Sequence, residues 1–142
     1  RNGVLTTIAP TGTTSMFGGN VASGIEPVFA TSYTRKITRP DGTKSEDLVQ
    51  DYAVWLYYQM FGEDTPLPDA FVTAQDLRPA DHVRMQAVAQ RWIDSGISKT
   101  VNCPEDIPFA VFEDVYRQAF ESGCKGCTTY RPNPVTGSVL ST

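Results

Sequence analysis

The sequence feature that most constrains the fold is a β-rich run that opens directly into a loop of small and hydroxyl-bearing residues. Val4–Ile8 predicts a buried strand, and Ala9–Ser15 follows it without a break. Such a loop can turn several backbone N–H groups toward one point, where they suit the oxygens of a phosphate. Gly12 lets the backbone approach a ligand closely. The hydroxyl donors of the loop are Thr11, Thr13, Thr14 and Ser15.

The same loop also fits a polar surface connection, because Gly, Ser and Thr are ordinary loop residues. No Lys follows Gly12, and the spacing matches neither of the common glycine-rich nucleotide-binding motifs. Glu26 follows in the sequence Gly-Ile-Glu-Pro and has two open interpretations. It braces the loop by accepting from loop amides, or it contacts a hydroxyl of a ligand.

Composition places the chain among soluble globular proteins of one domain. The chain has 142 residues, of which 40% are hydrophobic and 20% are charged. No apolar run approaches the length of a membrane span, and Arg1–Val4 lacks the features of a signal peptide. The sequence has no initiator Met and begins almost on a strand, which predicts a piece from the middle of a longer chain.

Charge and cysteine content narrow the expected partners. The net charge is −4, the sequence pI is about 4.9 and no strong basic patch is present, so DNA and RNA are not expected partners. A small anion is still a possible ligand, because its binding depends on nearby hydrogen-bond donors and not on the net charge of the chain. Three cysteines do not make a secreted disulfide framework, so a reducing cytoplasm is the expected location.

Hydrophobic periodicity predicts a mixed α/β chain. Strands are expected at Val4–Ile8, Ile97–Val101 and Cys127–Tyr130, an extended segment at 28–37, and helices at about 44–61, 79–93 and 108–122. The final strand–helix–strand order is the sequence form of a parallel βαβ unit. A turn is expected from Pro132 to Pro134, and a further element at Val139–Leu140.

Two of the helices carry specific signals. Thr43 and Glu46 have the spacing of a capping box, which predicts that the first helix begins there. Pro79 suits the first position of the second helix, because its missing N–H is not needed there. The apolar stripe of this second helix predicts a buried side made of Val83, Met85, Val88, Ala89 and Trp92.

Three other features have an ordinary structural interpretation. Cys124 and Cys127 follow a predicted helix C-terminus, which is the wrong end for a redox thiolate, and they lack the second pair that a zinc site requires. Two structural cysteines are therefore expected. His82 is expected to be solvated or hydrogen-bonded rather than a ligand or a base. Lys99 is expected to be solvated, with attraction of an anionic ligand as the alternative.

Six short blocks resemble the adenosylcobalamin-dependent (class II) ribonucleotide reductases. Each block alone is weak, but the blocks occur in collinear order along nearly the whole chain, and that order is specific. The blocks are Leu5–Thr13, Ser23–Phe29, Tyr33–Arg35, Asp81–Gln86, Ile97–Asn102 and Lys125–Asn133.

The resemblance implies an α/β fold in which residues 1–142 form the C-terminal part of a ten-stranded α/β barrel, a partial barrel of βαβ units with flanking helices. It also implies that a Pro-Thr-Gly-Thr loop binds the phosphates of the substrate ribonucleotide. By position, this role falls on Thr11, Gly12, Thr13, Thr14 and Ser15. In the family, adenosylcobalamin generates a thiyl radical on a cysteine, and the ribose 2′-hydroxyl is replaced by hydrogen.

The radical and redox cysteines of the family lie outside the matched blocks. No catalytic residue and no metal ligand is therefore expected in this segment, which alone is expected to bind no cofactor and to be inactive. Thr128 and Thr129 stand where the iron-dependent relatives carry a tyrosine pair, which favours the cobalamin class.

The implied partners are a ribonucleotide, bound through its phosphates, and the remainder of the barrel. A second copy of the chain is a further expected partner, because a cut barrel leaves strand edges unpaired. No nucleic acid and no membrane is expected. The alternative function is a free-standing phosphate- or nucleotide-binding domain without catalysis, and a further alternative is a thiol oxidoreductase that uses Cys124 and Cys127.

Overall fold

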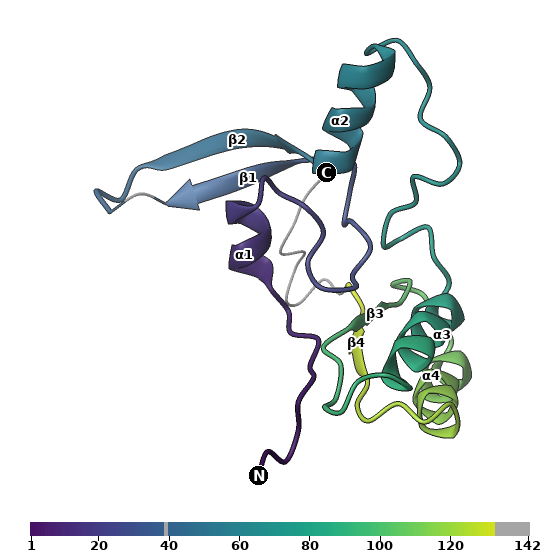
Figure 1. Ribbon diagram of the computed structural model, residues 1–142. Coiled ribbons are helices and arrows are strands. Elements are labelled where there is room, and N and C mark those ends of the chain that lie inside the picture. The colour runs from purple at the N-terminus through teal and green to yellow at the C-terminus, as the bar shows by residue number, and fades with distance from the viewer. Residues whose placement is uncertain (39, 133–142) are drawn as a thin grey trace.

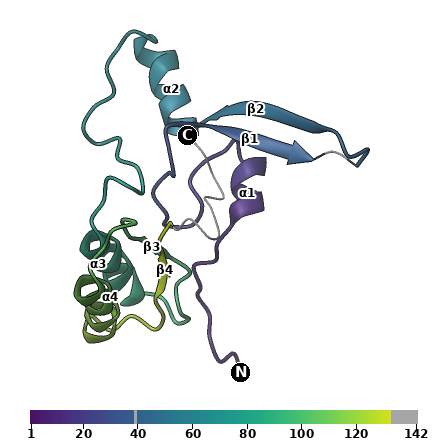
Figure 2. The same cartoon turned by 180° about the vertical axis from the view of Figure 1, so that it is seen from behind.

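The computed structural model describes residues 1–38 and 40–132, which form helices and strands in mixed order (Figure 1). The elements are α1 (Gly12–Phe17), β1 (Ser32–Thr38), β2 (Lys44–Gln50), α2 (Tyr52–Phe61), α3 (Pro79–Gln90), β3 (Thr100–Asn102), α4 (Phe109–Glu121) and β4 (Thr128–Tyr130). The β1–β2 hairpin projects away from the rest of the chain, and α3 and α4 pack side by side next to β3 and β4 (Figures 1 and 2).

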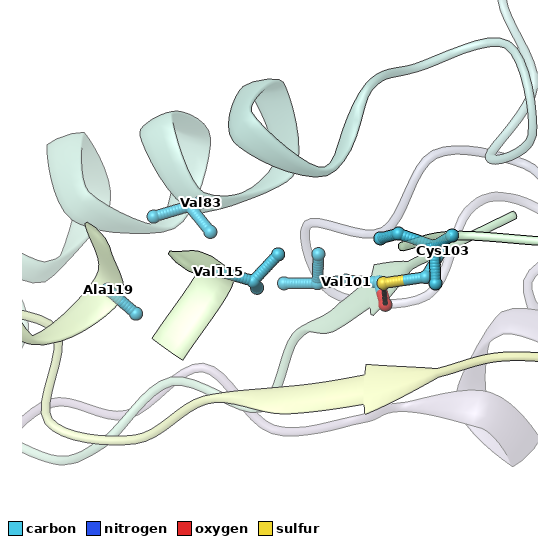
Figure 3. Close-up of a cluster of buried hydrophobic side chains, with 6 residues drawn as sticks. Val83, Val101, Cys103, Val115 and Ala119 are labelled. Carbon is cyan, nitrogen blue, oxygen red and sulfur yellow. Dashed lines mark hydrogen bonds between the residues drawn. The ribbon is translucent and has the colours of Figure 1, made fainter. Parts of the chain in front are cut away.

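The β3–α4–β4 unit confirms the predicted parallel βαβ arrangement. The two strands pair in parallel, with Thr100 opposite Thr128 and Asn102 opposite Tyr130. Side chains from α3, α4 and β3 meet in one buried cluster beside this unit, which fixes the position of β3 (Figure 3). The cluster consists of Val83, Val101, Cys103, Ile107, Val115 and Ala119.

The N-terminal segment lies beside the residues that lead into β3, but the regular strand predicted at Val4–Ile8 is wrong. Ile8 forms a single isolated parallel bridge with Ile97. Upstream of that bridge, Thr6 N donates to Asp94 Oδ2 at 3.1 Å rather than to a neighbouring strand. The parallel pairing does not extend from Ile8 toward Val4, because the Asp94 carboxylate accepts from the Thr6 amide that a strand partner would otherwise use.

The predicted helix at about 44–61 is wrong in its first part, which is strand β2. β1 and β2 pair antiparallel along their full length, with Ser32 opposite Gln50 and Thr38 opposite Lys44. The extended segment predicted at 28–37 overlaps β1 and is the partner that makes a strand of 44–50. Cross-strand pairing therefore overrides the helical spacing of the apolar residues in this region.

The start of α2 depends on Asp51 and not on the predicted capping box. Asp51 accepts hydrogen bonds from Ala53 N at 2.9 Å and from Val54 N at 3.3 Å, which satisfies two amides of the first turn. Thr43 instead donates through its hydroxyl to Asp41 at 2.6 Å in the connection between β1 and β2.

α3 confirms the predicted helix at 79–93 but buries a different face. Of the predicted buried side only Val83 is fully buried, whereas Met85, Val88 and Trp92 are exposed. Polar side chains occupy the interior because they satisfy carbonyl groups of the neighbouring loops. Gln86 Nε2, for example, donates to Gly126 O at 2.7 Å. The inward-facing residues of α3 are His82, Val83, Gln86 and Gln90.

The described residues contain two two-stranded sheets, β1–β2 and β3–β4, and no closed barrel. The bridge between Ile8 and Ile97 adds a third parallel segment beside β3. The ten-stranded barrel stays a prediction. The turn predicted from Pro132 and the element at Val139–Leu140 fall outside the described residues, apart from Pro132 itself.

Candidate functional site

The predicted phosphate loop forms the first turn of the short helix α1. Thr11 is its N-terminal cap and has left-handed backbone angles, with φ of 49° and ψ of 25°. Ser15 N donates to Thr11 O at 2.8 Å and is the first amide with an intrahelical partner. The amides of Gly12, Thr13 and Thr14 precede it and have no acceptor within a helix of this geometry. The backbone at Gly12 is open, because a Cβ built there meets nothing within 4 Å.

The four hydroxyl groups of this turn divide into two pairs. Thr13 and Thr14 are exposed to solvent. Thr11 Oγ1 accepts from Gly24 N at 2.8 Å, and Ser15 Oγ donates to Val21 O from a buried position. The structure thus brings all the predicted site residues onto one turn. Thr11, Thr13 and Thr14 are exposed, and Thr11 and Ser15 are the two whose hydroxyls are hydrogen-bonded to the loop at 18–27.

The loop at 18–27 fits tightly against the segment that precedes α1. Gly24 has a φ of 56°, and a Cβ at this position would stand 2.9 Å from Ala9 O. Glu26 N donates to Ser23 O at 2.9 Å and closes a turn that contains Gly24. Only glycine fits at Gly24, for both reasons, and the loop amide next to α1 is therefore fixed in position.

A buried cluster of charged residues holds the other end of this loop. Lys99 Nζ donates to Glu26 Oε2 at 2.9 Å, to His82 Nδ1 at 3.0 Å and to Thr100 O at 3.2 Å. The Lys99 side chain is 1% exposed and that of Glu26 is 25% exposed. Thr100 N also donates to Glu26 Oε1. The expectation of a solvated Lys99 is wrong, and all three ammonium donors already have acceptors.

The sequence predicts a solvated or hydrogen-bonded His82, and the structure shows it buried and hydrogen-bonded. Its Nε2 lies 3.1 Å from Ala74 O, which can only accept, so Nε2 carries the proton and Nδ1 accepts from Lys99. Burial lowers the pKa of His82, and the positive charge of Lys99 lowers it further. The ring is therefore neutral and both of its nitrogens are engaged.

Glu26 also lines a cavity of about 250 Å³ beside the loop at 18–27. Asp51 and Ser15 belong to the same wall. Of the two interpretations left open by the sequence, a structural role is supported, but the partners differ: the Glu26 carboxylate accepts from Lys99 Nζ and Thr100 N at the start of β3 and not from loop amides. A contact between Glu26 and a ligand stays a prediction.

The three cysteines are reduced and belong to or pack against the hydrophobic cluster. Cys103 is buried, and Cys124 and Cys127 pack against the hydrophobic cluster. Burial raises the pKa of all three thiols, and the two neighbouring cysteines raise that of Cys127 further. Within residues 1–38 and 40–132, no group of three or more His, Cys, Asp or Glu side chains could hold a metal ion.

Sequence reasoning treated Glu26, His82 and Lys99 separately and did not join them. Lys99 lies 73 residues from Glu26 and 17 residues from His82 in the chain. The available signal was the run at 97–102, which places Lys99 at the start of a buried strand. A lysine at such a position needs an acceptor nearby, and the carboxylate and imidazole side chains of the matched blocks that can accept are those of Glu26, Asp81 and a neutral His82.

The parallel strand–helix–strand unit and the loop before it define an α/β protein with an open helical turn next to a buried ion pair. Residues 1–130 match the family model described as "Ribonucleotide reductase, barrel domain". The chain therefore belongs to the ribonucleotide reductase barrel-domain family.

Several curated relatives carry names that agree with this family. A vitamin B12-dependent ribonucleoside-diphosphate reductase of Thermoplasma acidophilum is 37% identical, with 99% of this chain and 20% of the relative covered. The enzyme of the same name from Mycobacterium tuberculosis is 34% identical, with 99% and 22% covered. A vitamin B12-dependent ribonucleotide reductase of Streptomyces clavuligerus is 29% identical, with 99% and 17% covered. The chain thus spans about a fifth of the length of these relatives.

None of the helices in the described part of the chain has the length and apolar character needed to cross a membrane. The longest, α4, has 13 residues.

Proposed function

We propose that this segment is the substrate-phosphate-binding part of a vitamin B12-dependent ribonucleotide reductase. The whole protein would convert ribonucleotides to deoxyribonucleotides by thiyl-radical chemistry with adenosylcobalamin. The observation that carries the proposal is the open first turn of α1, in a chain that belongs to the reductase barrel family. The phosphate-binding residues are Thr11, Gly12, Thr13, Thr14 and Ser15.

These residues would act in two ways. The amides of Gly12, Thr13 and Thr14, with the exposed hydroxyls of Thr13 and Thr14, would donate to the phosphate oxygens. Thr11 and Ser15 would hold the turn in place through their bonds to Gly24 N and Val21 O. Each hydrogen bond to a charged group contributes roughly 1.5–3 kcal/mol. A few such bonds alone give about millimolar affinity after association costs, so the base and ribose must be bound by other parts of the protein.

We assign no residue of this segment to adenosylcobalamin or to the radical chemistry. Both nitrogens of His82 are engaged, and the pKa values of Cys103, Cys124 and Cys127 are raised. The cofactor, which supplies the radical when bound, would be held by the remainder of the protein. The segment alone should form no deoxyribonucleotide with adenosylcobalamin and a dithiol. Product formed by the pure segment would contradict this assignment.

The remainder of the barrel is the proposed partner of the exposed apolar residues on α3. Met85 and Val88 are more than half exposed, and Trp92 just beyond the helix is 82% exposed. In the segment alone, a second copy would cover such side chains, and light scattering would then give a dimer or larger species. A monomer at all concentrations would contradict self-association but not the barrel assignment.

The phosphate assignment is tested in the complete reductase that contains this segment. Gly12→Val places a β-branched side chain where the phosphate would approach, so substrate affinity measured by isothermal titration should fall at least tenfold. Cys124→Ser is the matched control, because Cys124 packs against the hydrophobic cluster and is outside the proposed phosphate-binding residues. Equal substrate affinity for Gly12→Val and the parent protein would overturn the phosphate assignment.

A further inference from the structure

We infer that Lys99 is a positioning residue for the phosphate loop: through Glu26 it holds the loop at 18–27, and that loop holds the first turn of α1. The inference rests on the proposed function, because it gives the loop geometry a role in substrate binding. It assigns Lys99 no contact with substrate, since its three donors are already used.

The first link is the attachment of Glu26 to β3. One carboxylate oxygen accepts from Lys99 Nζ at 2.9 Å, and the other accepts from Thr100 N. Lys99 also donates to Thr100 O at 3.2 Å, so the ammonium group that binds Glu26 is itself held at the start of β3. β3 is itself fixed by the buried side chain of Val101, which is 0% exposed. Glu26 is therefore attached to a strand that packs into the buried hydrophobic cluster.

The second link carries this position from Glu26 to the phosphate loop. Glu26 N closes the turn onto Ser23 O at 2.9 Å, and Gly24 within that turn donates its amide to Thr11 Oγ1 at 2.8 Å. Gly24 lies close to the segment before α1, where a side chain does not fit, because a Cβ there would stand 2.9 Å from Ala9 O. These two hydrogen bonds connect Glu26 through the turn at 23–26 to Thr11, so we expect a displacement of Glu26 to displace Gly24 and Thr11.

The chemistry of the cluster supports a role in positioning rather than in stability. Lys99 is buried and Glu26 is partly buried; desolvating such a pair is costly, and it adds little net stability compared with apolar side chains of the same size. A directional pair does fix geometry, because each of the three Lys99 donors has one acceptor. His82 completes the set: it is locked by Ala74 O on one side and presents a bare Nδ1 to Lys99 on the other.

The experiment uses the complete reductase and measures stability and steady-state kinetics together. Lys99→Met keeps the stem of the side chain and removes the donors, so it should lower the thermal midpoint and raise KM for the nucleotide about tenfold, with a smaller change in kcat. The double variant Lys99→Met with Glu26→Gln removes both charges of the ion pair. Its thermal midpoint should recover toward that of the parent, while its KM stays raised because the loop is no longer held.

Three outcomes separate this inference from a structural role and from the proposed function. If KM recovers in the double variant together with the thermal midpoint, Lys99 is only structural and the inference is overturned. If Gly12→Val weakens nucleotide binding but Lys99→Met leaves KM unchanged, the inference alone fails. If Gly12→Val has no effect on binding, the proposed function fails first.

A milder pair of variants serves if Lys99→Met does not fold. Thr11→Val removes the acceptor of Gly24 N, and Glu26→Gln removes the charge that Lys99 holds while keeping the size of the side chain. Both substitutions interrupt the same series of contacts between Lys99 and Thr11, so their effects on nucleotide Kd should not add. The Kd of the double variant should be about equal to that of the single variant that binds the nucleotide less tightly. Independent, additive losses would overturn the inference.

Discussion

Thr6 and Asp94 exchange hydrogen bonds although they lie 88 residues apart in the chain. Asp94 N donates to Thr6 Oγ1 at 2.9 Å, and the same hydroxyl donates to Asp94 Oδ2 at 3.1 Å. Leu5 N adds a further bond to Asp94 Oδ2 at 3.0 Å. Together with the bridge between Ile8 and Ile97, this exchange fixes the segment that leads into α1.

The first prediction concerns the acid sensitivity of this contact. The hydrogen bond from Leu5 N, followed by those from Thr6, lowers the pKa of Asp94 below its ordinary value of 3.8. A lowered folded-state pKa means that the ionised carboxylate contributes stability above about pH 4, and that this contribution is lost as pH falls through the folded-state pKa. Asp94→Asn should therefore lower the thermal midpoint near neutral pH, and the difference from the parent should shrink below pH 4.

Scanning calorimetry across this pH range checks the prediction, with the exposed Asp64→Asn as control. A difference between Asp94→Asn and the parent that stays constant down to about pH 2 would show that the carboxylate charge has no part in the contact.

The second prediction concerns Gly24. Gly24→Ala forces a side chain into the left-handed region, which costs roughly 1–2 kcal/mol, and also places a Cβ 2.9 Å from Ala9 O. The free energy of unfolding should fall by at least that amount in urea titrations. Gly126→Ala is the matched control, because a Cβ at Gly126 meets nothing within 4 Å. Equal stability of the two variants would contradict the tight fit of the loop.

The elements that the sequence predicted well are those in which local signals and packing agree. α3 begins at Pro79, and α4 ends just before Gly123, which has a φ of 79°. The parallel unit follows from two short apolar runs on either side of α4. The helix prediction failed at 44–50, where the residues have helical spacing but pair with β1. The residues of 44–50 alone do not reveal that β1, which precedes them in the chain, is available as a strand partner.

The candidate site was predictable only in part, for a related reason. The backbone donors of the phosphate loop are local, so the run of Gly, Thr and Ser reveals them. The buried ion pair is not local, because Lys99 finds its partners only after α3, β3 and the loop at 18–27 have assembled. A lysine in an extended run looks the same whether it faces solvent or Glu26. The sequence therefore identified the residues of the turn but not what holds the turn in place.

The third prediction distinguishes the observed cap of α2 from the predicted one. Asp51→Ala leaves the amides of Ala53 and Val54 without their acceptor, so the free energy of unfolding should fall by about 1 kcal/mol. Thr43→Ala removes a bond at the exposed end of the hairpin and should change stability by less than about 0.5 kcal/mol. Chemical denaturation of both variants is the measurement. A larger loss for Thr43→Ala would favour a helix that begins at Thr43.

The fourth prediction concerns the thiols and tests the oxidoreductase alternative. Burial raises the pKa of Cys103, Cys124 and Cys127 above the ordinary value of 9.0, because the charged thiolate is poorly solvated there. Since the thiolate is the reactive form, alkylation by iodoacetamide should be slow at neutral pH and should accelerate only above about pH 9. Mass spectrometry of the labelled protein follows each cysteine separately.

Free cysteine labelled under the same conditions is the control for this measurement, and each protein thiol should react more slowly than it does at every pH. Cys127 should be the slowest of the half-buried pair, because its two cysteine neighbours raise its pKa in addition to burial. Rapid labelling of Cys124 or Cys127 near pH 6 would require a stabilised thiolate. Among the described residues, no positive charge lowers the pKa of Cys124 or Cys127. Such a result would therefore revive a redox role for the Cys-x-x-Cys pair.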